Sequence, residues 1–118
     1  MKWLLILLAC AACKQQAEAP PQREGPAAPA MPASEVKRSQ DACKAYVDKA
    51  CACADTVPAM KQACALARPL AEAIQVDLDV AAHPESSRRD ALQAQDSVRK
   101  IFKECIEQTA KLPAAGCP

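Results

Sequence analysis

The feature that most constrains this chain is a long glycine-free segment whose apolar residues recur every three or four positions. No glycine occurs between Gly25 and Gly116, and no alternation of apolar and polar residues suggests a strand. Spacings of three and four place side chains on one face of an α-helix. The segment therefore predicts an all-α fold.

Breaks in this pattern predict three helices, at about 37–54, 58–82 and 87–112. Pro58 ends the first helix, because proline restricts the residue before it, and the loop at 83–87 separates the other two. Because short connections make neighbouring helices antiparallel, we expect a three-helix up-down-up bundle. A helical hairpin with a loosely docked third helix is the alternative.

Local signals support these helices. Ser39, followed by Asp41, is a reasonable cap for the first helix. Ser87, with Asp90 three residues later, resembles a capping box at the start of the third. The faces expected to pack together are Val36, Ser39, Cys43, Tyr46, Val47, Ala50, Cys51 and Ala54 in the first helix, Ala63, Ala67, Leu70, Ala71, Ile74, Leu78 and Ala81 in the second, and Ala91, Ala94, Val98, Ile101, Phe102, Cys105, Thr109 and Leu112 in the third.

The N-terminus has the layout of a secretory signal. One charge at Lys2 is followed by an apolar run, Trp3 to Ala9, which is far shorter than the roughly 20 residues of a membrane-spanning helix. Residues Leu7-Leu8-Ala9-Cys10 resemble the lipobox of bacterial lipoproteins. The alternatives are cleavage before Cys13, and an N-terminal helix of an intracellular protein.

The lipobox resemblance implies a signal peptide at 1–9, removed so that the mature chain begins at Cys10. In that class the cysteine thiol carries diacylglycerol and the new amino terminus is acylated, typically with palmitate. An aspartate after the lipidated cysteine often retains such proteins in the inner membrane, whereas this chain has Ala11. The resemblance thus implies a lipid-anchored protein at the outer membrane, facing the periplasm.

Residues 10–34 are expected to form a disordered linker, rich in proline and alanine. Prolines at 20, 21, 26, 29 and 32 lack backbone donors and interrupt any helix. Such a segment acts as a semi-extended tether of about 3 Å per residue. The cysteine-rich helical domain is then expected to span 35–118, about 85 residues, enough for one small domain.

Six cysteines in this domain predict a disulfide framework, because disulfides persist in an exported protein. Cys43 and Cys51 are about two helical turns apart, too far to bond each other. The bundle places the cysteines near one pole, where either Cys51 or Cys53 can reach Cys64. Among the fifteen pairings that six cysteines allow, the favoured set is Cys51–Cys64, Cys43–Cys105 and Cys53–Cys117.

Other cysteine chemistry is less well supported. Cys51-Ala52-Cys53 is a C-x-C motif, which also occurs in metal sites and in thiol-disulfide exchange proteins. Metal sites usually have C-x-x-C spacing, and the single histidine, His83, lies in an inter-helix loop, so no metal site is predicted. With cleavage at Cys10, Cys13 is an unpaired thiol, able to link two copies into a dimer.

The remaining composition argues against several functions. The chain has 15 Lys plus Arg and 14 Asp plus Glu, and loss of Lys2 balances them, so no nucleic-acid partner is expected. No nucleophile elbow or phosphate-binding loop is present, and no enzymatic activity or cofactor is expected. We expect a non-catalytic module that binds an envelope protein or acts structurally. A small-ligand or metal-binding module, or thiol-disulfide exchange at Cys51 and Cys53, is the alternative.

Overall fold

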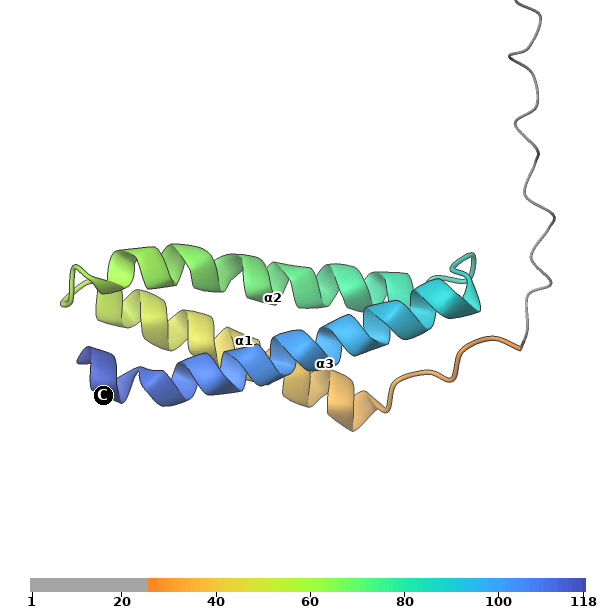
Figure 1. Ribbon diagram of the computed structural model, residues 1–118, viewed down its shortest axis with the longest axis horizontal. Helices are drawn as coiled ribbons and strands as arrows, with labels where there is room; N and C mark the ends of the chain where they lie inside the picture. The colour runs from red at the N-terminus through yellow and green to blue at the C-terminus, as the bar shows by residue number, and fades with distance from the viewer. Residues whose placement is uncertain (1–25) are drawn as a thin grey trace, which may run out of the picture.

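The computed structural model describes residues 26–118. The expected signal peptide at 1–9, the lipidation candidates Cys10 and Cys13, and most of the expected linker lie outside the described residues. Within the described part, three α-helices and one short 3-10 helix follow one another along the chain (Figure 1): α1 (Ala33–Ala54), α2 (Met60–Ala82), α3 (Arg88–Lys111) and η1 (Pro113–Ala115).

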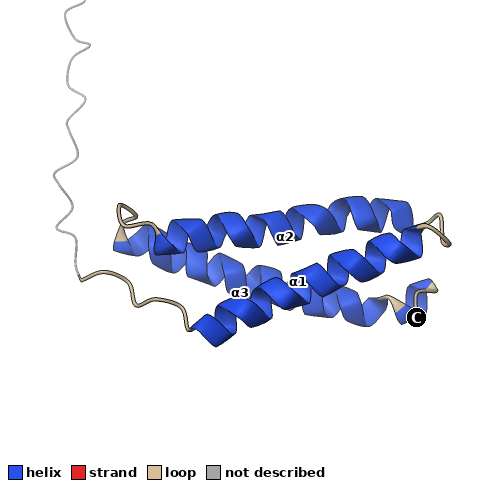
Figure 2. Ribbon diagram, turned by 180° about the vertical axis from the view of Figure 1, so that it is seen from behind, coloured by secondary structure: helices blue, strands red, loops and turns tan. Residues whose placement is uncertain are grey.

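The helices form an up-down-up bundle, as predicted from the sequence. α1 and α3 run in the same direction and α2 runs against both, and each helix packs on the other two (Figures 1 and 2). The alternative with a loosely docked third helix is wrong, since a disulfide between Cys43 and Cys105 joins α1 to α3.

The start of α1 differs from the expectation. The helix begins at Ala33 rather than 37, because the Pro32 carbonyl accepts the first bonds, from the backbone N–H groups of Glu35 and Val36 at 2.9 and 3.1 Å. Ser39 is not the cap that the sequence suggested. It is 1% exposed, inside the helix, and its hydroxyl donates to the Glu35 carbonyl oxygen at 2.9 Å.

The other two helices begin close to their predicted positions. α2 starts at Met60 rather than 58, because Pro58 and Ala59 form a turn, with the Met60 N–H bonded to the Val57 carbonyl. The predicted cap of α3 is confirmed. The Asp90 N–H donates to Ser87 Oγ at 3.0 Å, and that hydroxyl donates to the Asp90 carboxylate at 2.7 Å.

The core is built from small and medium side chains. Ala50 and Ala67 are fully buried, so the helices approach closely where these residues meet a neighbour. Ile74 and Val98 are the largest aliphatic side chains with almost no exposure, and Tyr46 is the aromatic ring of the core. None of the helices in the described range has both the length and the hydropathy of a membrane span.

Residues 26–32, here called the strap, belong to the folded domain. The strap runs alongside α3 in an extended conformation and leads into the start of α1. Arg88 Nη1 donates to the carbonyl oxygens of Pro26 and Ala27 at 2.8 and 3.2 Å, and Gln95 Nε2 donates to that of Pro29 at 2.7 Å. The folded part therefore starts before the expected boundary at residue 35. The sequence had assigned these residues to the disordered linker because prolines exclude a helix, but an extended segment can still dock through its carbonyl groups.

Candidate functional site

Two disulfides lie at one end of the bundle, where α1 ends and α2 begins. This end, defined by Cys51, Cys53, Cys64 and Cys117, is called the disulfide pole. Cys51–Cys64 joins the last turns of α1 to the first turns of α2, with Cα atoms 4.6 Å apart. Both cysteines are half-buried, so this disulfide is open to solvent.

The second disulfide of the pole, Cys53–Cys117, holds the C-terminal tail against α1, with Cα atoms 5.7 Å apart. After α3 the chain makes the short helix η1 and turns back at Gly116, whose φ of 92° favours glycine. The Cys117 N–H then donates to the Leu112 carbonyl oxygen at 2.9 Å. The turn directs Cys117 into the bundle, where it is 2% exposed.

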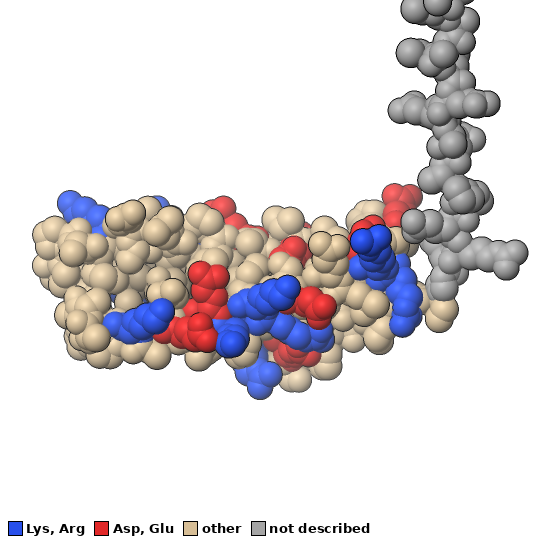
Figure 3. Space-filling view, in the orientation of Figure 1, with Lys and Arg blue, Asp and Glu red and all other residues tan. Residues whose placement is uncertain are grey.

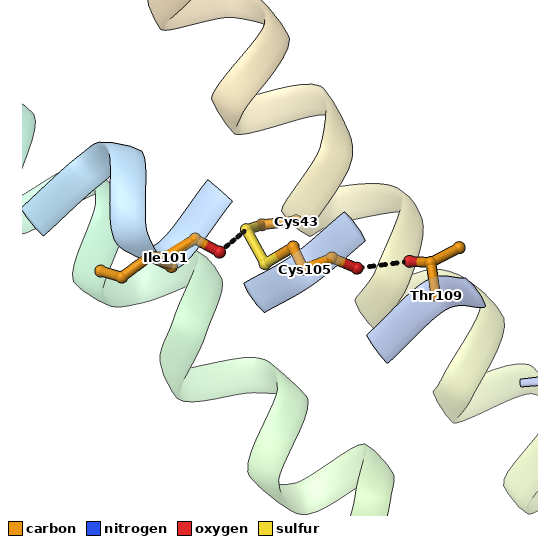
Figure 4. Close-up of a disulfide and its surroundings, with 4 residues drawn as sticks. All are labelled: Cys43, Ile101, Cys105 and Thr109. Carbon is orange, nitrogen blue, oxygen red and sulfur yellow. Dashed lines mark hydrogen bonds between the residues drawn. A yellow bond between two sulfur atoms is a disulfide. The ribbon is translucent and has the colours of Figure 1, made fainter. Parts of the chain in front are cut away.

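The third disulfide, Cys43–Cys105, lies deeper, between the middle of α1 and the last third of α3 (Figure 4). Both cysteines are fully buried. Cys43 Sγ lies 3.8 Å from the Ile101 carbonyl oxygen, a contact without a proton because the sulfur is bonded. Thr109 Oγ1 donates to the Cys105 carbonyl oxygen at 2.7 Å. This disulfide fixes how α1 and α3 are aligned along the bundle.

The structure brings together the three pairs that the sequence favoured, and all six cysteines of the described range are bonded. Cys51 and Cys53 bond different partners, so the C-x-C motif contains no free thiol here. In residues 26–118 no cluster of three or more His, Cys, Asp and Glu residues is placed to hold a metal ion. His83 is exposed, and its Nδ1 accepts from the Glu85 N–H at 3.2 Å.

Charged side chains of both signs interleave on the surface, and in Figure 3 they gather over α3. Arg99 bridges α3 to α1 through Glu35, Nε to Oε1 at 2.7 Å, and also contacts Asp96. Hydrogen bonding to Glu35 raises the pKa of Arg99 above its ordinary value. Lys44 hydrogen-bonds Asp48, which raises the pKa of that lysine. In these contacts exposed side chains of opposite charge neutralise each other.

The outer side of α2 carries exposed apolar side chains that sequence reasoning missed. Leu66 is 64% exposed, Val76 60% and Val80 37%. With Pro69 and the partly buried Ala73 they recur at three- and four-residue spacing along one face of α2; this set is called the α2 stripe. Its last member, Val80, also borders a depression lined by α3 residues. The signal was present in the sequence as a second periodic set beside the expected core face. Contiguous exposed apolar patches on a protein surface can mark interaction sites.

A shallow groove of about 540 Å³ lies between α1 and α3. Phe102 and Ile106 of α3 and Ala42 of α1 give it an apolar lining, and Lys37, Arg38, Asp41 and Ser34 stand along the α1 side. The Arg38 guanidinium carbon lies 5.4 Å from the centre of the Phe102 ring, a cation–π contact. The groove is open to solvent along its length.

No family model, curated protein or solved structure matches the chain.

Proposed function

We propose that this chain is a lipoprotein of the cell envelope, anchored through acyl chains on Cys10 at the outer membrane and facing the periplasm. Its helical domain is a non-catalytic module that binds another envelope protein. The proposal combines the Leu7-Leu8-Ala9-Cys10 motif with the properties of the folded domain.

The observation that carries the proposal is the full pairing of the six domain cysteines. Disulfides form and persist in oxidising compartments and are rare where thiols are kept reduced. A domain this small buries little apolar surface, so its stability depends on such cross-links. Export past the inner membrane would bring the domain into an oxidising compartment, where these disulfides can form. The signal-like N-terminus supports such export.

The binding role rests on the α2 stripe. Leu66 and Val76 expose most of their side-chain surface on a helix that keeps its own inner face buried. A protein partner with a complementary apolar face would remove this surface from water. A second candidate, binding of a small amphiphile, is favoured by the groove between α1 and α3 with its apolar lining.

Intact mass spectrometry of the mature protein from membranes tests the anchor. The expected mass is that of residues 10–118 with a diacylglyceryl group in place of the Cys10 thiol hydrogen and an acyl group in place of one amino hydrogen, less six hydrogens for three disulfides. Cys10→Ser should abolish acylation and Cys13→Ser should not. An unprocessed chain, or lipid lost only in Cys13→Ser, would contradict anchoring at Cys10.

The two binding roles are separated by purification from detergent with paired variants. Leu66→Glu with Val76→Glu should abolish recovery of a specific envelope protein, whereas Phe102→Ala with Ile106→Ala should leave it intact. Native mass spectrometry showing a bound small molecule that only the second pair of substitutions removes would favour the groove instead.

A further inference from the structure

The strap occupies a position along α3 that α1 does not reach. Glu35 pairs with Arg99, and Cys43 is bonded to Cys105, so the first residue of α1 lies about level with residues 95–97 of α3. The first two turns of α3, from Arg88, therefore extend roughly 10 Å beyond the start of α1. Residues 26–32 run alongside those two turns. The strap thus takes the place of α1 at this end of the bundle.

The strap is held by contacts that suit a proline-rich segment. Prolines have no N–H, so hydrogen bonds to such a segment must go to its carbonyl oxygens. Gln95 and Arg88 supply the donors, to Pro29 and to Pro26 with Ala27. The Gln95 side chain is buried, at 4% exposure. Ala91, one turn earlier on α3, is 5% exposed although the first residue of α1 does not extend as far as Ala91. A buried amide needs a partner, because leaving it unpaired costs about 1 to 3 kcal/mol.

The strap determines where the preceding chain leaves the domain. Pro26 lies beside Arg88, next to the 83–87 loop that joins α2 to α3. This is the end of the bundle opposite the disulfide pole (Figure 1). Without the strap the chain would leave at Ala33, part-way along the side of the bundle.

We infer that the strap orients the anchored domain, so that the disulfide pole and the C-terminal tail face away from the bilayer. The inference rests on the proposed lipid anchor at Cys10. Residues 11–25 connect that anchor to the strap and can extend at most roughly 50 Å. The two ends of the bundle are separated by about the length of α2, roughly 34 Å for its 23 residues. Attachment at one tip makes that tip the membrane-proximal end on average and leaves the pole as the free end, which periplasmic partners can reach.

Limited digestion of the full mature chain with elastase, read by mass spectrometry, tests the strap itself. Elastase cuts after small residues, so Ala17-Glu18, Ala27-Ala28 and Ala30-Met31 are comparable target bonds. The two bonds within the strap should be protected in the wild type and cut in Arg88→Ala with Gln95→Ala. The control, Arg89→Ala with Gln93→Ala, changes exposed residues of the same turns and should keep the protection. Cleavage of the strap bonds in the wild type as fast as Ala17-Glu18 would overturn the inference, as would unchanged protection in Arg88→Ala with Gln95→Ala.

Energy transfer in liposomes tests the orientation. The lipidated chain carries one fluorophore on a non-natural amino acid, at position 85 in the α2–α3 loop or at position 55 at the disulfide pole, and the bilayer contains an acceptor lipid. Transfer should be higher from position 85, and this difference should become smaller in Arg88→Ala with Gln95→Ala but be kept in the control variant. Equal transfer from both positions in the wild type would overturn the orientation. Failure of the wild type to float with liposomes would instead refute the lipid anchor, while the elastase pattern would still test the strap.

Discussion

At the scale of single residues, the core depends on small side chains and on one aromatic ring. Ala50 and Ala67 allow close helix contacts, and Tyr46 supplies the bulk that alanine cannot. Tyr46 is 6% exposed, and burial raises the pKa of its phenol, with the negative charge of Glu104 adding to the effect. The ring therefore places a titratable group inside the core.

Replacing Tyr46 with phenylalanine should reduce the loss of stability at alkaline pH. The unfolded phenol loses its proton near pH 10, whereas the folded protein holds it to higher pH. The free energy of unfolding is thus unaffected by this phenol below about pH 10. It falls as the pH rises further, because the unfolded state then binds fewer protons than the folded state. Melting temperatures from circular dichroism should fall more for the wild type than for Tyr46→Phe between about pH 9 and pH 11. Parallel curves for the two proteins would show that the phenol does not titrate differently on folding.

At the scale of helices, sequence periodicity predicted the three elements and their order, and it was least accurate at the first boundary. The cap at Ser87 was predicted because its signal is local, a serine three residues before an acid. The start of α1 was predicted wrongly because Ser39, followed by Asp41, also suggested a cap. Ser39 lies inside the helix, where its hydroxyl donates to the Glu35 carbonyl oxygen instead. Only the packing of the whole helix distinguishes the two uses of a serine.

Pro69 lies inside α2, where proline disfavours a helix, and replacing it with alanine should stabilise the domain. Proline has no N–H for the Ala65 carbonyl, and its ring crowds that carbonyl, a combination that costs up to about 3 kcal/mol in a helix interior. Because Pro69 is exposed, alanine removes this cost without changing the core. Pro69→Ala should raise the free energy of unfolding in urea by about 1 to 3 kcal/mol.

Pro58 provides the matched control for that measurement. It lies in the turn between α1 and α2, where proline restricts the unfolded chain and costs no helical hydrogen bond. Pro58→Ala should therefore leave stability unchanged or lower it slightly. A gain from Pro58→Ala equal to that from Pro69→Ala would mean that the helix carries no specific strain at Pro69.

At the scale of the whole molecule, α1 contributes one cysteine to each of the three disulfides. Its three cysteines, 43, 51 and 53, reach α3, α2 and the C-terminal tail. An up-down-up bundle limits which cysteines can meet, so the sequence narrowed the pairing, but it left open whether Cys51 or Cys53 bonds Cys64. The strap was not accessible, since its docking depends on Gln95 and Arg88, which a helical pattern marks only as polar positions on α3. The α2 stripe was overlooked because periodicity was used to find one apolar face per helix.

The three disulfides should contribute unequally to stability, and paired alanine variants measure the difference. Loop-closure entropy gives about 3 kcal/mol for Cys51–Cys64, with a sequence separation of 13, and about 4 kcal/mol for Cys43–Cys105 and Cys53–Cys117, with separations of 62 and 64. The last two disulfides close loops of nearly equal length, so loop-closure entropy does not distinguish them. We expect a larger loss of stability for Cys43→Ala with Cys105→Ala than for Cys53→Ala with Cys117→Ala, because the first pair is fully buried and its removal also disturbs the packing around it. Urea unfolding of the three double variants should rank the losses in the order Cys43–Cys105, Cys53–Cys117, Cys51–Cys64.

Under mild reductant the half-buried Cys51–Cys64 should open first, as read by alkylation and mass spectrometry, since the others are shielded until the bundle opens. Reduction of Cys43–Cys105 before Cys51–Cys64 would contradict this account of the core.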